Sequence, residues 1–184
     1  DSDESAKAAW TTLDLTNLME NCPPSGQGKA TRFEFYLQGS GEVLVDNMAF
    51  LSNGGGSLVS NGNFESGVSG WTRRGVLRNS YAESGVGVGG SRALHVVSVG
   101  RGDTGANKIV STMTATAATG SPNTGTIRAS VRWLKGSPWI MLRPRGHWME
   151  ASVRLNVPAN SGTPGLTNSR GVSNAGAAIT EVAH

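Results

Sequence analysis

Residues 31–50, TRFEFYLQGSGEVLVDNMAF, decide the fold expected of this 184-residue chain. In the first seven of them, Phe33, Phe35 and Leu37 alternate with residues that share the other face, which is the pattern of a half-buried strand. A Gly-Ser-Gly turn then leads into a second apolar run at residues 42–50. The segment therefore predicts two strands joined as a β-hairpin.

Similar strand signals recur along the rest of the chain. They are expected at residues 94–99, 108–114, 126–134, 139–143 and 147–157, with a shorter run at 178–182. The clearest alternation lies in residues 147–157, whose apolar face would hold Met149, Ala151, Val153, Leu155 and Val157. Gly, Ser, Thr and Asn supply 75 of the 184 residues, which excludes a helical bundle. The expected class is all-β.

Composition also predicts the domain organisation. A Ser-Asn-Gly-Gly-Gly stretch at residues 52–56 is too flexible to pack and forms the best internal boundary. Residues 1–52 are expected to form an N-terminal hairpin arm, residues 57–157 a jelly-roll β-sandwich, and residues 158–184 an extended tail rich in Gly, Pro and Asn.

Charge is unevenly distributed along the chain. Residues 1–50 contain three basic and eight acidic side chains, a net charge of −5, whereas residues 51–184 contain 13 and five, a net charge of +8. Opposite charges favour docking of the arm on the rest of the chain or on another copy. The alternative is that both segments are simply solvated surfaces.

Two stretches indicate a family resemblance. LVSNGNFESGVSGW at residues 58–71 resembles the opening of the galactose-binding-like jelly roll, as in carbohydrate-binding modules of the family 4 and 9 type, and residues 91–100 and 127–136 look like its later strands. Residues 33–50 look like the closing hairpin of the same fold, placed ahead of the opening strand. Residues 146–184 resemble linkers of large multi-module bacterial surface proteins with lamin-tail and spore-coat-kinase-like domains.

The inverted order implies that residues 57–157 form an incomplete sheet, whose open edge must be filled. The arm could fold back on its own chain or complete a neighbouring copy by strand addition. The expected function is a non-catalytic extracellular or cell-surface building block that self-associates head to tail into a fibre or array. The buried arm residues would be Phe33, Phe35, Val43 and Val45.

The resemblance also implies a possible structural calcium ion. Jelly rolls of this type often hold Ca²⁺ where the opening loop meets the closing strand, and hard cations take carboxylate and carbonyl ligands. By position, Glu65 and Asp46 would supply the side-chain oxygens. A solvated loop position for Glu65 is the alternative.

The alternative function is carbohydrate binding. Alternation in the last strand points Trp148 away from the apolar face, and sugars stack on exposed aromatic rings with polar groups beside them. The accompanying residues would be Trp139, Arg143, Arg145, His147 and Arg154. The same composition is equally that of a protein interface, so both interpretations stay open here.

Other functions find little support in the sequence. No nucleophile, metal-protease or Cys-x-x-Cys motif occurs, so we expect no catalytic activity and no required cofactor. The basic residues are dispersed and follow no nucleic-acid motif, so a nucleic-acid partner is not expected. No apolar run reaches the roughly 18 residues of a membrane helix. Cys22, the single cysteine, has no intrachain partner.

Overall fold

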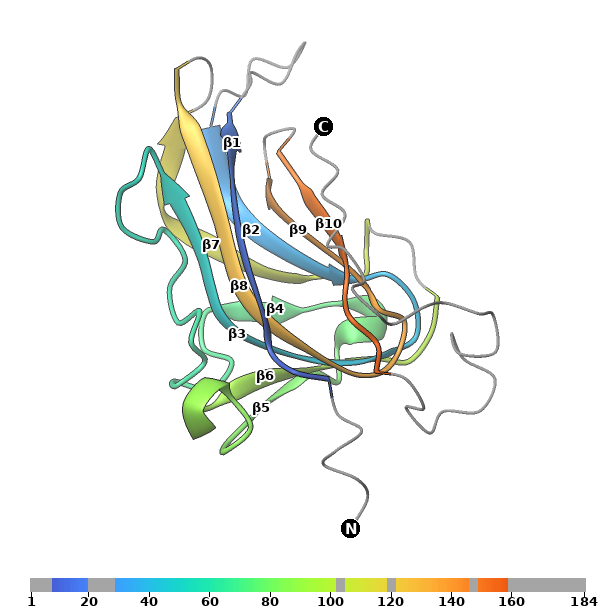
Figure 1. Ribbon diagram of the computed structural model, residues 1–184. Helices are drawn as coiled ribbons and strands as arrows, with labels where there is room; N and C mark the ends of the chain where they lie inside the picture. The colour runs from blue at the N-terminus through green and yellow to red at the C-terminus, as the bar shows by residue number, and fades with distance from the viewer. Residues whose placement is uncertain (1–7, 20–28, 102–104, 119–121, 146–148, 159–184) are drawn as a thin grey trace.

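A computed structural model describes residues 8–19, 29–101, 105–118, 122–145 and 149–158. In them the chain forms two antiparallel sheets of five strands each, packed face to face (Figure 1). The prediction of an all-β sandwich is confirmed. Cys22, His147, Trp148 and the run at 178–182 lie outside the described residues.

The first sheet has the order β1-β8-β3-β6-β5 and the second has the order β10-β9-β2-β7-β4. The strands of the first are β1 (Thr11–Leu18), β8 (Thr124–Gly136), β3 (Gly41–Ser52), β6 (Ala93–Ser98) and β5 (Tyr81–Glu83). Those of the second are β10 (Ala151–Arg154), β9 (Trp139–Arg145), β2 (Lys29–Leu37), β7 (Ile109–Ala118) and β4 (Trp71–Arg73). Two 3-10 turns, η2 (Gly75–Leu77) and η3 (Val88–Gly90), complete the elements. No described helix is long and apolar enough to cross a membrane.

The predicted hairpin at residues 31–50 is wrong. Both strands exist, but β2 pairs with β7 and β9 in the second sheet, while β3 pairs with β6 and β8 in the first. Residues 38–40 therefore carry the chain across the core from one sheet to the other. The physical reason is that both strands have a fully apolar face, and facing each other across the sandwich buries both faces at once.

The core between the sheets is built on these two strands. Phe33, Phe35, Val43 and Val45 are completely buried, and the rings of Phe33 and Phe50 stack with their centroids 6.1 Å apart. Burial of each such side chain stabilises the fold by about 1.5 to 3 kcal/mol before entropy costs. Residues 29–52 thus supply the middle strand of each sheet.

The alternation predicted for residues 147–157 is present, but the hydrogen-bonded strand is shorter than expected. Met149, Ala151, Val153, Leu155 and Val157 are all buried, as their spacing predicts, yet only Ala151–Arg154 pairs with β9 as a strand. Strand β1 was not predicted. It is an edge strand in which only Leu13 is fully buried, so its apolar period is weak.

A bulge in β3 ties this strand to the loop that follows it. The register with β8 shifts between Asp46 and Ala49, and Asn47 takes a positive φ of 52° inside the shift. The Met48 N–H donates to the Gly62 carbonyl at 2.9 Å. A Cβ added at Gly62 would lie 1.8 Å from the Met48 carbonyl oxygen, so this close backbone approach requires glycine.

We expect Gly62→Ala to lower the free energy of unfolding by about 1 to 3 kcal/mol, because the backbone of β3 must shift to make room. Gly56→Ala is the matched control, since a Cβ there meets nothing within 4 Å, and its change should stay within about 0.5 kcal/mol. Urea unfolding of both variants measures the difference. Equal stabilities would contradict the contact.

Candidate functional site

The outer surface of the second sheet gathers basic side chains. In the pairing of β2 with β9, Arg32 lies opposite Arg145 and Glu34 opposite Arg143, while Trp139 lies opposite Arg154 on β10. The residues between them on each strand are buried in the core, so these side chains share the outer surface. We name this surface the basic face, consisting of Arg32, Lys108, Trp139, Arg143, Arg145 and Arg154.

A buried carboxylate lies at the centre of the basic face. Glu34 has no exposed surface, and its oxygens accept hydrogen bonds from Lys108 Nζ at 2.6 Å, Arg143 Nε at 3.0 Å and the Tyr36 hydroxyl at 2.5 Å. Arg145 Nη1 lies 3.7 Å away, as a longer ion pair. Arg143 also donates to the Tyr36 hydroxyl at 2.9 Å and lies over its ring. This network fixes the orientation of Arg143.

The network changes the protonation of its members. Burial alone would raise the pKa of Glu34, but hydrogen bonds from Lys108, Tyr36 and Arg143 outweigh burial and hold that pKa below its usual value. Burial and the neighbouring Glu34 carboxylate raise the pKa of Tyr36, so the phenol keeps its proton as a donor. The carboxylate is therefore the ionised anchor of the face at neutral pH.

The margin of the basic face is accessible to solvent. Trp139 is 40% exposed and the side chain of Arg145 is 53% exposed. Arg143 also contacts Glu150, with 3.6 Å between Nη1 and the carboxylate. Arg154 keeps a buried Nη2 that has no hydrogen-bond partner. An exposed aromatic ring at one end of the face and the half-exposed guanidinium of Arg145 at the other end are therefore accessible to a ligand.

The sequence predicted part of this arrangement. Trp139, Arg143, Arg145 and Arg154 were expected to act together, and the pairing of β10, β9 and β2 brings them onto one surface. Trp148 and His147, expected in the same group, lie outside the described residues. The residues that sequence reasoning missed are Glu34, Tyr36 and Lys108. For these residues the sequence predicts only that Glu34 and Tyr36 lie on the face of β2 opposite Phe33 and Phe35.

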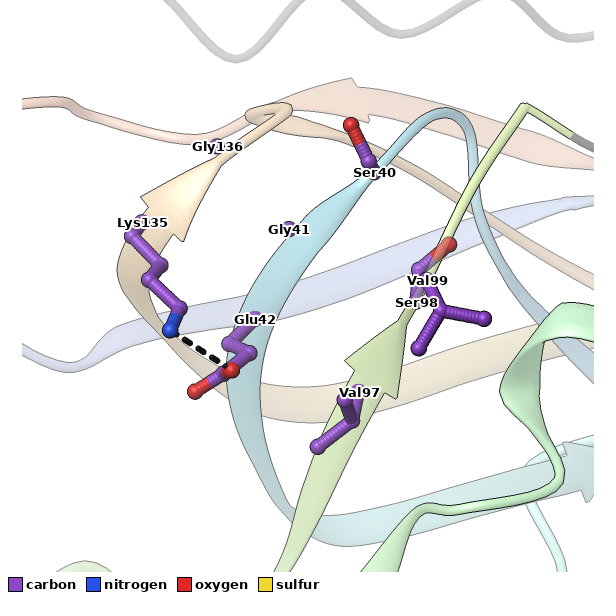
Figure 2. A pocket seen from close by; sticks show the side chains of 8 residues that line it. All are labelled: Ser40, Gly41, Glu42, Val97, Ser98, Val99, Lys135 and Gly136. Atoms are coloured by element: carbon purple, nitrogen blue, oxygen red, sulfur yellow. Dashed lines mark ion pairs between the residues drawn. The ribbon is translucent and has the colours of Figure 1, made fainter.

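A hollow of about 300 Å³ opens at the end of the first sheet (Figure 2). Figure 2 shows the ion pair of Lys135 and Glu42, at 2.8 Å, on one wall, with Val97 and Val99 across from it. Because these two charges compensate each other, the hollow offers a ligand fewer unpaired polar groups than the basic face does.

Glu42 also belongs to a cluster of polar side chains around His95. His95 contacts Glu42 through Nε2 at 3.0 Å and Glu83 through Nδ1 at 2.7 Å, and the ring of Tyr81 stacks on it. Both imidazole nitrogens are thus occupied by carboxylates, and the contacts hold the short edge strand β5 against β6. Hydrogen bonds to acids leave no ring nitrogen to activate a nucleophile.

The two proposed calcium ligands, Asp46 and Glu65, both accept hydrogen bonds from the loop at residues 88–92. Asp46 accepts hydrogen bonds from the N–H groups of Asn47 and Val88 and from the Ser91 hydroxyl. Glu65 accepts one from the N–H of Arg92. The described residues contain no group of three or more His, Cys, Asp or Glu side chains that could hold a metal ion. Calcium stays a prediction from the sequence.

Comparison of the chain with protein-family models, with curated proteins and with solved structures finds no match. The resemblance to the galactose-binding-like jelly roll therefore stays a prediction from the sequence. What bears on function is the geometry of the basic face.

Glu34→Gln is expected to lower the free energy of unfolding by about 3 to 5 kcal/mol at neutral pH, because Lys108 and Arg143 lose their buried counter-charge. Asp14→Asn is the matched control. Its exposed pair with Arg128 contributes no more than about 1 kcal/mol. Urea unfolding at pH 7 measures both, and equal losses would contradict the role of Glu34.

In Glu34→Gln, the free energy of unfolding should depend less on pH in the acid range. Folding lowers the pKa of Glu34, so its stabilising effect is present above the unfolded-state value of about 4.3 and is lost as pH falls from there through the folded-state pKa. Between pH 5 and pH 3, Glu34→Gln should therefore lose less stability than the natural sequence. An identical pH dependence of the two would be the contrary result.

Asp46→Ala should lower Tm, because it removes two hydrogen bonds that hold the loop containing η3 and a third from the Asn47 N–H. Melting the unaltered chain in EDTA and in millimolar Ca²⁺ decides the calcium prediction. Hydrogen bonds alone leave Tm unchanged between the two solutions, whereas a bound ion raises Tm in Ca²⁺ and the rise disappears in Asp46→Ala.

Proposed function

We propose that this chain is a non-catalytic carbohydrate-binding module of an extracellular or cell-surface protein and that the basic face is its binding surface. The observation that carries the proposal is that the exposed Trp139 and the oriented Arg143 lie on one surface, with Arg154 opposite Trp139 on β10. Carbohydrate sites combine an apolar surface with a few well-placed polar groups.

Preorganisation supports this proposal. A long arginine side chain loses rotamer freedom when it binds a ligand, and that loss weakens binding. Glu34 and Tyr36 already hold Arg143, so its ordering is completed on folding. Trp139 is on a paired strand, not on a loop, and so presents its ring from a rigid position.

Self-association by strand donation is the second function expected from the sequence, and it would need copies to exchange the strands that now complete their own chain. Both β2 and β3 already have two neighbours within the chain. An assembly that donates both strands would be a domain swap through residues 53–56, which join β3 to the rest of the chain. We therefore place carbohydrate binding first.

Trp139→Ala is expected to abolish retardation of the protein in native gels that contain a bound polysaccharide, because the stacking surface is lost. Tyr81→Ala is the matched control: Tyr81 is similarly exposed, at 45%, but lies on the other sheet, and its removal should leave retardation unchanged. Melting curves of both variants establish that they are folded. Equal retardation of Trp139→Ala and the natural sequence would exclude this surface.

A further inference from the structure

We infer that the ligand of the basic face is a carboxylated polysaccharide, a polymer containing uronic acid residues. The inference rests on the proposed function and adds the charge and length of the ligand. It comes from three properties of the described residues: the charge surplus of the face, the exposed guanidinium groups of Arg32 and Arg145, and the separation of the two ends of the face.

The basic face has a surplus of positive charge. It contains five cationic side chains, and the carboxylates that contact them are those of Glu34 and Glu150. Three positive charges therefore remain uncompensated among the described residues of the face. A neutral polysaccharide would leave this surplus unused, whereas an anionic one would be attracted to it before contact.

The surplus is carried by exposed arginines without a close hydrogen-bonded carboxylate. Arg145 lies 3.7 Å from Glu34, beyond hydrogen-bonding distance, and no described carboxylate pairs with the exposed Arg32. Because these two residues lie opposite each other on β2 and β9, their side chains are neighbours. A guanidinium binds a carboxylate through two parallel N–H donors, which gives orientation as well as affinity.

The two ends of the face are separated by most of the length of β9. Trp139 and Arg154 form one end, and Arg145 and Arg32 the other, six residues along the strand. At about 3.4 Å per residue the separation is roughly 20 Å. A ligand that reaches both ends is a chain of several sugars rather than a single one.

Nucleic acid is the less suitable polyanion for this face. Binding of single strands uses successive aromatic rings on which bases stack. Among the described residues of the face and its buried centre, Trp139 is exposed while Tyr36 is 1% exposed and engaged with Glu34. One accessible ring suits a sugar chain that stacks at one point and is held by arginines elsewhere.

The test is affinity electrophoresis of the full chain in gels containing polygalacturonate, a neutral galactomannan, dextran sulfate or single-stranded DNA. We expect retardation by polygalacturonate alone, weakened about tenfold in Arg145→Gln and in Arg154→Gln. Arg128→Gln, which removes an equally exposed arginine from the outer surface of the other sheet, should bind as the natural sequence does.

The other outcomes overturn the inference in distinguishable ways. Retardation by galactomannan that depends on Trp139 but not on the arginines would refute the carboxylate requirement and keep the proposed function. Equal retardation by dextran sulfate or DNA would show a general polyanion surface and refute the inference. Retardation by none of the four polymers would refute both.

Discussion

The short crossing from β2 to β3 is the constraint on which the rest of the structure depends. Residues 38–40 take the chain from the middle of one sheet to the middle of the other, and they place Phe33 and Phe50 against each other across the core. The other strands of each sheet lie on either side of β2 or β3. Without β2, β7 and β9 would have no common neighbour, and without β3 the same would hold for β6 and β8.

The same strand that closes the core also builds the basic face. On β2, Phe33 and Phe35 point inward while Glu34 and Tyr36 point outward. A buried carboxylate is costly unless cations and hydrogen-bond donors surround it, so the position of Glu34 determines where Lys108 and Arg143 lie. The stability of the sandwich and the arrangement of its candidate site are therefore physically coupled.

Sequence alternation predicted which face of most strands is buried, but not which strands are neighbours. Alternation fixes the inward residues of 149–157 and 33–37, because period two is a local property. Pairing is a long-range property, and the Gly-Ser-Gly turn was compatible with a hairpin as well as with a crossing between sheets. For the same reason Trp139 and Arg143 could be selected from one strand. Glu34, Tyr36 and Lys108 acquire their role only through neighbours distant in the sequence.

Residue-resolved hydrogen exchange on the intact chain, at a concentration where its mass in solution is 19.1 kDa, tests the central placement of residues 29–52 most directly. Amides of central strands exchange only on global unfolding, whereas those of a peripheral arm exchange by local opening. The structure predicts that the amides of β2 and β3 are among the slowest in the protein, as slow as those of β8 and β9. Rapid exchange of β2 and β3 beside protected strands in residues 57–157 would contradict it.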